Sequence, residues 1–259
     1  MTEDEFLIAH VRDLKTKCAD NSIITHTNFL DMRQRTVLSF LKKEQAEFVK
    51  TVIWGGFDDS ERAVMIFIPR FYESFDPEEI FEDDPDLCPI TVLRADKDKF
   101  SVLSHRDYLG ALMGLSIKRE LIGDIIIDEN GAYIICLKSI EHFITENLTS
   151  AGRATLTVKS TSFSDIKSME FKTKEIFSSV ASTRLDCIVS SAFSISRTKA
   201  VSAIESGITY VNGLQILKPD YKINEGDKIV LRGKGKAVLS QIKGESKKGR
   251  LHIIIKKFI

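Results

Sequence analysis

The sequence has no net charge, few cysteines and only one tryptophan. Its 259 residues include 37 Lys or Arg and 37 Asp or Glu. The four cysteines, Cys18, Cys88, Cys136 and Cys187, lie far apart without a Cys-x-x-Cys pair, and the five histidines are equally dispersed. This spacing argues against a zinc site or a disulfide framework. We therefore expect buried single thiols and no cofactor.

Long apolar runs are also missing. The first five residues have neither the basic start nor the apolar stretch of an export signal, and no run approaches the length needed to cross a bilayer. We therefore expect a cytoplasmic protein. Apolar residues still make up 43% of the chain, which is ample for folded cores, and the length favours two or three domains.

The neutral total conceals a charge asymmetry along the chain. Residues 181–259 contain 15 Lys or Arg against 6 Asp or Glu, whereas residues 1–180 contain 22 against 31. In the C-terminal part the cations cluster around predicted helix starts and glycine turns. Clustering of this kind favours a polyanionic partner over a merely solvated surface.

The basic C-terminal part is predicted to begin with two short helices. Ser182 or Thr183 can cap the first helix, and Ser196 can cap the second. Arg197 and Lys199 then fall in the first turn of the second helix, where the helix dipole disfavours cations. Two cations beside unpaired backbone amides indicate that an anion binds at that end.

A β-hairpin is predicted to follow these helices. Strands at 208–211 and 214–217 flank Asn212-Gly213, a dipeptide that tolerates the positive φ angles of a two-residue turn. A third strand at 228–232 runs into cations that are separated by glycines, which let the backbone approach a polyanion closely. These cations are Arg232, Lys234 and Lys236.

The ordered set from Arg184 to Lys236 resembles the S-four RNA-binding domain. That domain is shared by a small-subunit ribosomal protein, bacterial tyrosyl-tRNA synthetases and many pseudouridine synthases. The resemblance places an S-four domain with a C-terminal β extension at residues 181–259. It implies an RNA-facing set consisting of Arg184, Ser196, Arg197, Lys199, Asn212, Arg232, Lys234 and Lys236.

Residues 1–72 are predicted to form a small α+β domain. Two apolar stripes at helical spacing indicate helices up to about residue 48, and strands at 49–54 and 63–69 are predicted to pair as a hairpin. Trp54 could stack on a base, but a strand-end tryptophan more often fills a core with its indole N–H satisfied. The stripes consist of Phe6, Leu7, Val11 and Leu14, and of Val37, Leu38, Leu41 and Phe48.

Residues 73–88 are predicted to be a solvated acidic linker. Eight acids and two prolines fall between Glu73 and Asp86, which is too polar to bury and too proline-rich for a regular strand. The segment lacks the loop glycine and the alternating ligands of a calcium site.

Residues 89–180 show a βαββαβ pattern. This order predicts a four-stranded sheet with two helices on one face, as in RNA-recognition modules. Tyr133 is a candidate for base stacking, but its neighbours Ile134, Ile135 and Cys136 lack the paired aromatics of that signature. The sheet is therefore either an unconventional RNA-binding surface or a scaffold. The predicted elements are strand 90–94, helix 105–117, strands 124–128 and 132–137, helix 140–148 and strand 153–159.

The segment His105–Leu115, followed by Ile117–Glu120 and Ile122–Ile125, is similar to the signature of the YlmH family. Members of that family combine an N-terminal domain, an RNA-recognition-like middle domain and a C-terminal S-four domain. Ser116 stands where the family pattern has glycine, and we expect this change to ease the local turn requirement. The resemblance implies a second RNA surface formed by His105, Arg106, Lys118 and Arg119.

The resemblance also implies a function. Family members bind structured rRNA on large ribosomal subunits that are obstructed by a peptidyl-tRNA, and support untemplated C-terminal tailing of the stalled nascent chain. Their genes are associated with cell-division clusters. We therefore expect a non-catalytic protein whose partners are rRNA, peptidyl-tRNA and a nascent-chain quality-control factor.

Two other functions are considered. His105-Arg106-Asp107 is similar to the segment that carries the catalytic aspartate of pseudouridine synthases, which makes an rRNA-modifying enzyme one alternative. Those enzymes, however, usually place the S-four domain first, before a much larger catalytic domain. The chain also lacks a glycine-rich nucleotide fingerprint. The second alternative is a cell-division scaffold that binds protein through residues 1–180.

Overall fold

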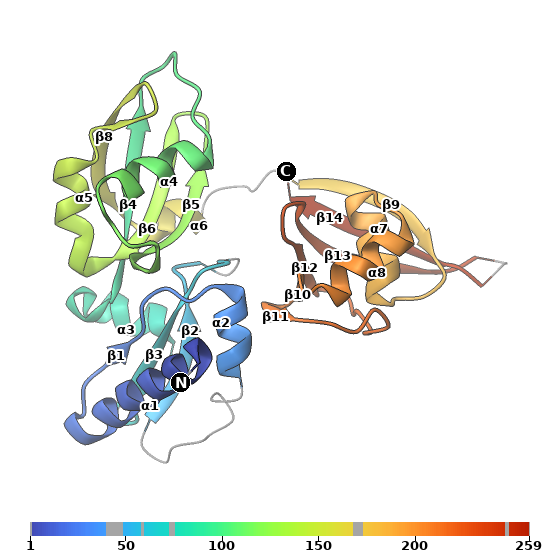
Figure 1. The fold of residues 1–259 in the computed structure, drawn as a ribbon, viewed down its shortest axis with the longest axis horizontal. Coiled ribbons are helices and arrows are strands. Elements are labelled where there is room, and N and C mark those ends of the chain that lie inside the picture. Colours follow the sequence, from blue (N-terminus) through green and yellow to red (C-terminus); the bar gives the residue numbers. More distant parts are fainter. Residues whose placement is uncertain are drawn as a thin grey trace. The chain divides into compact units, whose positions relative to one another are not determined.

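The computed structural model divides into two compact units, Met1–Met169 and Glu170–Ile259, which are described separately below (Figure 1). Both units combine helices with mainly antiparallel sheets, so the fold class is α+β. All four cysteine thiols are free and buried, as the sequence predicts. In the part of the chain that is described, no helix is long and apolar enough to cross a membrane. The described residues are 2–39, 49–57, 60–72, 76–167, 173–246 and 249–258.

The N-terminal part of the first unit packs two helices around a three-stranded sheet. The sheet order is β1-β3-β2, and β2 and β3 pair antiparallel from Val49 opposite Pro69 to Trp54 opposite Val64. This pairing confirms the predicted hairpin. The elements are α1 (Glu3–Asn21), β1 (Thr25–His26), α2 (Met32–Val37), β2 (Val49–Trp54) and β3 (Val64–Pro69).

The apolar stripe of α1 differs from the prediction at one position. Val11 and Cys18 are buried, and Leu7 and Leu14 pack against the same core, but Phe6 is 64% exposed. Positions 7, 11, 14 and 18 follow the helical repeat, whereas position 6 is rotated by about 100° from position 7. In the second stripe Leu38 is buried, while Leu41 and Phe48 lie outside the described residues.

The described part of the expected acidic linker is folded. Residues Pro77–Asp83 form α3 and Pro85–Leu87 form the 3-10 turn η2, with Ile80 and Phe81 buried. Each proline stands at the start of its helical segment, where a missing N–H costs no hydrogen bond. The acids face solvent while the two apolar side chains enter the core. Composition alone was therefore misleading, and the prediction of a solvated linker was wrong for this stretch.

The middle of the first unit contains a five-stranded sheet of order β5-β6-β4-β8-β7. Helices α4 and α5 cover one face of it (Figure 1), where Tyr108, Leu112 and Ile144 pack on Leu93 and Ile134. The elements are β4 (Ile90–Lys97), α4 (His105–Gly114), η3 (Arg119–Leu121), β5 (Ile122–Ile127), β6 (Gly131–Leu137), η4 (Lys138–Ile140), α5 (Glu141–Asn147), β7 (Ser150–Ala151), β8 (Ala154–Thr161) and α6 (Phe163–Lys167).

The other face of this sheet is also covered. Ile135 and Leu137 of β6 share a core cluster with Ile66 and Ile68 of β3 and with Phe81 of α3. A strand that is buried on both faces reads as a continuous apolar run rather than an alternation. This accounts for the missing aromatic pair at the corresponding positions of β6.

Tyr133 is not an open stacking surface. The Arg94 guanidinium lies over its ring, 4.6 Å from the centroid. Arg94 is itself only 8% exposed and pairs with Asp128 at 2.6 Å and Asp96 at 2.7 Å. A base could stack on this face of Tyr133 only after displacing a guanidinium that two carboxylates hold in place.

The second unit is a six-stranded sheet of order β11-β10-β12-β13-β14-β9, with two helices on one face (Figure 1). Leu185, Ile188 and Val189 of α7 are buried in its core, on the face that the sequence predicts. The elements are β9 (Thr173–Val180), α7 (Leu185–Phe193), α8 (Arg197–Glu205), β10 (Thr209–Val211), β11 (Leu214–Gln215), β12 (Lys228–Leu231), β13 (Gly235–Glu245) and β14 (Leu251–Phe258).

Two local features of this unit differ from expectation. Strand β9 pairs with β14 along its whole length, so the boundary placed after residue 180 separates β9 from its own sheet. The N-cap of α7 is Arg184, not Ser182 or Thr183. The Thr183 carbonyl instead accepts from Ile223 N–H at 2.8 Å, which holds this stretch beside the 219–223 segment before the helix begins.

The predicted hairpin turn is confirmed. Asn212 and Gly213 have φ angles of 51° and 79°, as a two-residue turn of this type requires. The third strand also forms as predicted, at Lys228–Leu231.

Ser116 has a φ angle of 61°, so serine does not ease the turn but strains it. We expect Ser116→Gly to raise the free energy of unfolding of the first unit by about 0.5–1 kcal/mol, because relief of left-handed strain outweighs the added entropy of the unfolded chain. The measurement is chemical denaturation followed by Trp54 fluorescence, since Trp54 is the sole tryptophan and lies in this unit. Ser116→Ala is the control, and an equal gain there would contradict the explanation.

Candidate RNA interface

The start of α8 presents two cations beside a capped helix end. The Ser196 hydroxyl accepts from the Lys199 backbone N–H at 3.3 Å, which confirms the predicted cap. Ser196, Arg197 and Lys199 are all exposed. The first turn carries two cations, and the free backbone N–H groups of a helix point out of its N-terminal end. This end of α8 can therefore hold a phosphate.

A buried carboxylate positions the two arginines of this region. Asp186 is 1% exposed, and its carboxylate accepts from Arg184 Nε at 3.1 Å and from Arg197 Nε at 3.0 Å. The Cys187 backbone N–H donates to the same group at 2.9 Å. Burial alone would raise the pKa of Asp186, but hydrogen bonds from the two guanidiniums outweigh it and hold the pKa below its usual value.

Both arginine side chains remain accessible above this carboxylate. They are 43% exposed for Arg184 and 57% for Arg197. Sharing one partner fixes their directions and leaves a local excess of positive charge. The geometry suits a pair of phosphates or one phosphate held from two sides.

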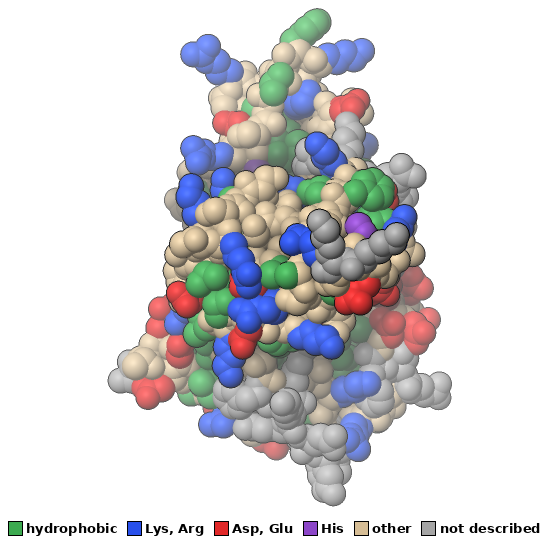
Figure 2. Space-filling model, turned by 90° about the vertical axis from the view of Figure 1, so that its right-hand side faces the viewer, with side chains coloured by type: hydrophobic (Ala, Val, Ile, Leu, Met, Phe, Trp, Pro, Cys, Tyr) green, Lys and Arg blue, Asp and Glu red, His purple; other side chains and the backbone are tan. Residues whose placement is uncertain are grey.

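The β12–β13 turn forms a second basic projection. Arg232 and Lys234 are exposed, and Gly233 and Gly235 have φ angles of 78° and 106°. A β-carbon would be strained at these angles, so the glycines allow the sharp turn that carries both cations outward. In Figure 2, Lys and Arg side chains are spread over the face turned to the viewer among apolar, acidic and uncharged groups.

Two other members of the predicted set have partners inside the protein. Lys236 lies over the Phe258 ring with its ammonium 4.7 Å from the centroid. The Asn212 amide donates to Asp227 at 2.8 Å, and its oxygen accepts from the Lys228 backbone N–H at 2.9 Å. The Asn212 side chain therefore ties the hairpin turn to the start of β12, so both its amide and its oxygen already have a partner within the unit.

The second predicted surface lies on and after α4. His105, Arg106 and Lys118 are exposed, but the Arg119 guanidinium donates to the carbonyls of Ile122 at 2.6 Å and Gly123 at 3.2 Å. Burial, followed by repulsion from the nearby Arg62, lowers the pKa of Arg119 to about 10. Arg119 thus supports the start of β5.

The charge of His105 at this surface depends on its surroundings. Although His105 is exposed overall, partial burial of its ring, followed by repulsion from Arg119, lowers its pKa below the ordinary value. At neutral pH the imidazole is therefore mainly uncharged, and Arg106 and Lys118 carry the positive charge of this surface.

Asp107 has a structural role at the start of α4. Its carboxylate accepts from the Ser104 backbone N–H and from the Ser104 hydroxyl, both at 2.7 Å. This is a capping box, which satisfies helix N–H groups that would otherwise lack partners. The hydrogen bonds, led by that from the Ser104 hydroxyl, lower the pKa of Asp107. Among the described residues, no group of three or more His, Cys, Asp or Glu side chains is arranged to hold a metal ion.

Only some of the predicted C-terminal site residues lie close together. The structure brings Arg184 and Arg197 together, places Ser196 and Lys199 in the same helix turn, and puts the remaining C-terminal residues elsewhere in the unit. The partner that sequence reasoning missed is Asp186. The sequence feature that could have indicated its role is a single carboxylate between Leu185 and Cys187, in an otherwise apolar stretch of the helix.

Three comparisons relate this chain to known proteins. The family model "Putative RNA-binding domain in YlmH" matches residues 90–165. The "Ribosome-associated protein quality control protein P2" of Bacillus subtilis (strain 168) is 33% identical over 227 residues, covering 88% of this chain and 84% of that protein. The solved structure "Cell division protein ylmH from Streptococcus pneumoniae" is 23% identical with a TM-score of 0.49, covering 64% of this chain and 94% of that one.

The family-model match places a YlmH-type RNA-binding domain at the centre of this α+β chain. The 33% identity to the Bacillus subtilis protein extends over 88% of this chain, so the similarity is not confined to one shared domain. The chain belongs to the YlmH family, which confirms the resemblance seen at His105–Ile125.

We expect Asp186→Asn to destabilise the second unit at pH 7 by about 1–3 kcal/mol, because two guanidiniums lose their charged partner. The pKa of Asp186 is lowered in the folded state, so its contribution is present above the unfolded value of about 4 and is lost as pH falls through the folded value. The difference between wild type and variant should therefore shrink below about pH 4.

Hydrogen exchange of the α7 and β10 amides in the full-length protein measures this effect. Glu205→Gln, at the exposed end of α8, is the control and should change protection little at any pH. A destabilisation by Asp186→Asn that is the same at pH 7 and pH 3 would show that the lost charge is not its cause.

Proposed function

We propose that this chain is a non-catalytic RNA-binding protein that binds structured rRNA on the large ribosomal subunit and supports C-terminal tailing of stalled nascent chains. The observation that carries the proposal is 33% identity over 88% of the chain to a protein named for ribosome-associated quality control. The family-model match to an RNA-binding domain supports RNA as the ligand.

The proposed domain organisation has three parts. Residues 1–72 form an N-terminal domain that packs on an RNA-recognition-like domain beginning at residue 89. The second unit, with β9 included, is an S-four RNA-binding domain with a C-terminal β extension. The exposed cations at the α8 start and the β12–β13 turn support this assignment.

In this mechanism the protein recognises RNA shape. The Asp186-anchored arginines and Lys199 hold phosphates of a folded RNA, and Arg232 and Lys234 hold a second part of the same backbone. Arg106 and Lys118 contribute a weaker contact from the first unit. Binding in this way would position the factor beside a peptidyl-tRNA, and a nascent-chain quality-control factor is the further partner that we propose.

The proposal predicts that Arg232→Gln with Lys234→Gln weakens binding to purified large subunits carrying peptidyl-tRNA. The slope of log affinity against log salt should fall by about one unit or less for each lost phosphate contact. Neither side chain is part of an internal ion pair among those described, so folding should be unaffected. The measurement is co-sedimentation over a salt series.

Lys218→Gln with Lys222→Gln is the matched control, because it removes the same charge from the same unit at exposed positions outside the proposed contacts. If both double variants lose affinity equally, net charge and not the β12–β13 turn determines binding. An unchanged salt slope in the first variant would contradict the assigned contact.

The enzyme alternative has its own test at Asp107. We expect Asp107→Asn to retain both RNA binding and tailing activity, because an amide oxygen can still accept from Ser104. A reconstituted tailing reaction and mass analysis of the rRNA are the measurements. Loss of a modified nucleotide while binding persists would instead identify Asp107 as a catalytic carboxylate.

A further inference from the structure

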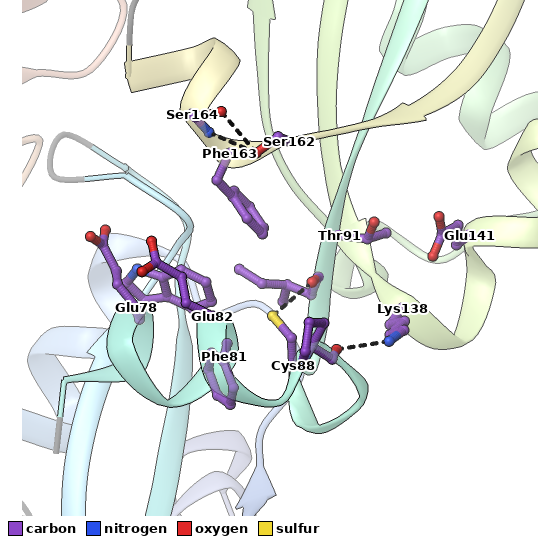
Figure 3. Close-up of a pocket in the computed structure, with 13 residues that line it drawn as sticks. Glu78, Phe81, Glu82, Cys88, Thr91, Lys138, Glu141, Ser162, Phe163 and Ser164 are labelled. Atoms are coloured by element: carbon purple, nitrogen blue, oxygen red, sulfur yellow. Dashed lines mark hydrogen bonds between the residues drawn. The ribbon is translucent and has the colours of Figure 1, made fainter. Parts of the chain in front are cut away.

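A base can stack only on an aromatic ring that is open to solvent, and the two rings considered from the sequence, Tyr133 and Trp54, are not open. A guanidinium covers Tyr133. The Trp54 ring lies 5.5 Å from Phe81 and 5.2 Å from Phe163, centroid to centroid, and these two phenylalanines line the same pocket of the first unit (Figure 3). The indole N–H has no acceptor among the described residues, contrary to the expectation that it would be satisfied.

The sheet of the second unit does present an open ring. Phe177 of β9 is 69% exposed. In the same strand Ile176 and Val180 pack into the core with the helices, so Phe177 points to the opposite face, because successive side chains of a strand alternate between faces. A single exposed ring is common on protein surfaces, and its neighbours therefore decide what it can bind.

Lysines surround Phe177 on this face of the sheet. Phe177 stands opposite Ile254 of β14, and the next residue of β14 on the same face is Lys256. The strand residues that point to this face include only one acid, Glu175, in the part of the second unit that is described. An excess of cations on one face attracts a polyanion. We call this side of the sheet the lysine face, and its lysines are Lys228, Lys236, Lys243 and Lys256.

The Lys243 ammonium lies over the Phe177 ring, 5.7 Å from its centroid. This contact differs from that between Arg94 and Tyr133, because Lys243 is exposed and pairs with no carboxylate of the described residues. Lys243 can therefore move from the ring to a phosphate when a base takes its place. An aromatic ring beside a cation is the combination with which single-stranded nucleic acids are commonly bound.

Further cations lie on both sides of the Phe177 ring along the strand. The Arg250 Nε–H donates to the Ser179 hydroxyl at 3.1 Å, and the same guanidinium donates to the Ser179 carbonyl. Ser179 shares the face of Phe177 and lies two residues away, about 7 Å along the strand. In the other direction Lys256 stands opposite Glu175. Arg250 and Lys256 are both exposed, so each can reach a phosphate next to a stacked nucleotide.

We propose that the lysine face binds an unpaired stretch of RNA, with one base stacked on Phe177 and the phosphates on either side held by Lys256 and Arg250. Lys243 holds the phosphate of the stacked nucleotide itself. A double helix does not fit, because its bases are paired and stacked inside. A lipid surface does not fit either, since interfacial binding requires a continuous apolar surface and Phe177 is surrounded by cations.

The choice of RNA over another single-stranded polyanion rests on the proposed function. The surface itself is separate from the start of α8, because α8 packs on the other face of the sheet through Ala200 and Ile204. The second unit therefore holds a folded part of an RNA on its helix side and an unpaired part on the lysine face.

The test uses the full-length protein and two fluorescein-labelled RNAs, an oligouridylate of about 12 nucleotides and a blunt duplex of about 12 base pairs. Fluorescence anisotropy gives the affinity for each RNA. Phe177→Leu keeps an apolar side chain but removes the ring, so we expect about five- to tenfold weaker binding of the oligouridylate and unchanged binding of the duplex. Phe177→Tyr retains a ring and should bind the oligouridylate like the wild type.

Phe6→Leu is the matched control for the loss of a ring, because Phe6 is 64% exposed and lies in the first unit. It should bind both RNAs like the wild type. Circular dichroism of each variant verifies that the fold is retained.

The lysines are tested by Lys243→Gln with Lys256→Gln. This double variant should weaken oligouridylate binding and lower its salt slope by about one unit or less for each lost phosphate contact. Lys218→Gln with Lys222→Gln removes the same charge from exposed positions outside the lysine face and should have a smaller effect. An equal effect of the two double variants would show that net charge, and not the lysine face, determines the binding.

The inference is overturned if Phe177→Leu binds the oligouridylate as tightly as the wild type, or if it weakens the duplex to the same extent. It is also overturned if the wild type binds phosphatidylglycerol vesicles and Phe177→Leu does not, because the face then takes a lipid surface.

Co-sedimentation of the same variants with large subunits carrying peptidyl-tRNA separates this inference from the proposed function. If oligouridylate binding does not depend on Phe177 while the wild type still co-sediments, only the role of the lysine face is refuted. If the wild type does not co-sediment while oligouridylate binding depends on Phe177, only the proposed ribosomal function is refuted.

Discussion

Burial of the middle sheet on both faces is the constraint on which the first unit depends. Strand β6 sends Ile134 and Cys136 toward the helices α4 and α5, and Ile135 and Leu137 toward β3 and α3. One strand therefore belongs to two cores and joins the N-terminal sheet to the middle sheet. The face that RNA-recognition modules usually present to bases is, in this region, an internal packing surface. The cations proposed as RNA contacts in this unit, Arg106 and Lys118, accordingly lie on and after α4.

In the second unit the constraint is electrostatic, because like-charged side chains that lie close together repel one another. The buried carboxylate of Asp186 pairs with both Arg184 and Arg197 and so lowers the repulsion between them. Both arginine side chains remain about half exposed. At the β12–β13 turn, Gly233 and Gly235 have positive φ angles that allow a sharp turn. This turn places Arg232 and Lys234 at the surface, away from the sheet. Positive charge is thus concentrated at the surface yet tolerated by the fold.

The features that could be predicted from sequence are those fixed by neighbouring residues. The Ser196 cap and the Asn212-Gly213 turn depend on local backbone chemistry, and both formed as expected. The missed features depend on distant partners. Nothing near residues 173–180 shows that this strand pairs with the C-terminal strand, and nothing in an acidic, proline-containing stretch shows that Phe81 will meet Trp54. Likewise, Asp186 stands out only once Arg184 and Arg197 converge on it.

The structure shows where the charge asymmetry of the sequence lies in the fold. The acids of residues 76–86 belong to a folded segment, because Ile80 and Phe81 of α3 are buried in the core of the first unit. The cations after residue 181 gather on a separate unit. The neutral total therefore conceals an acid-rich folded segment in the first unit and an excess of cations in the second. Positive charge gathered on one folded unit gives that unit a local attraction for a polyanion that the net charge of the whole chain does not reveal.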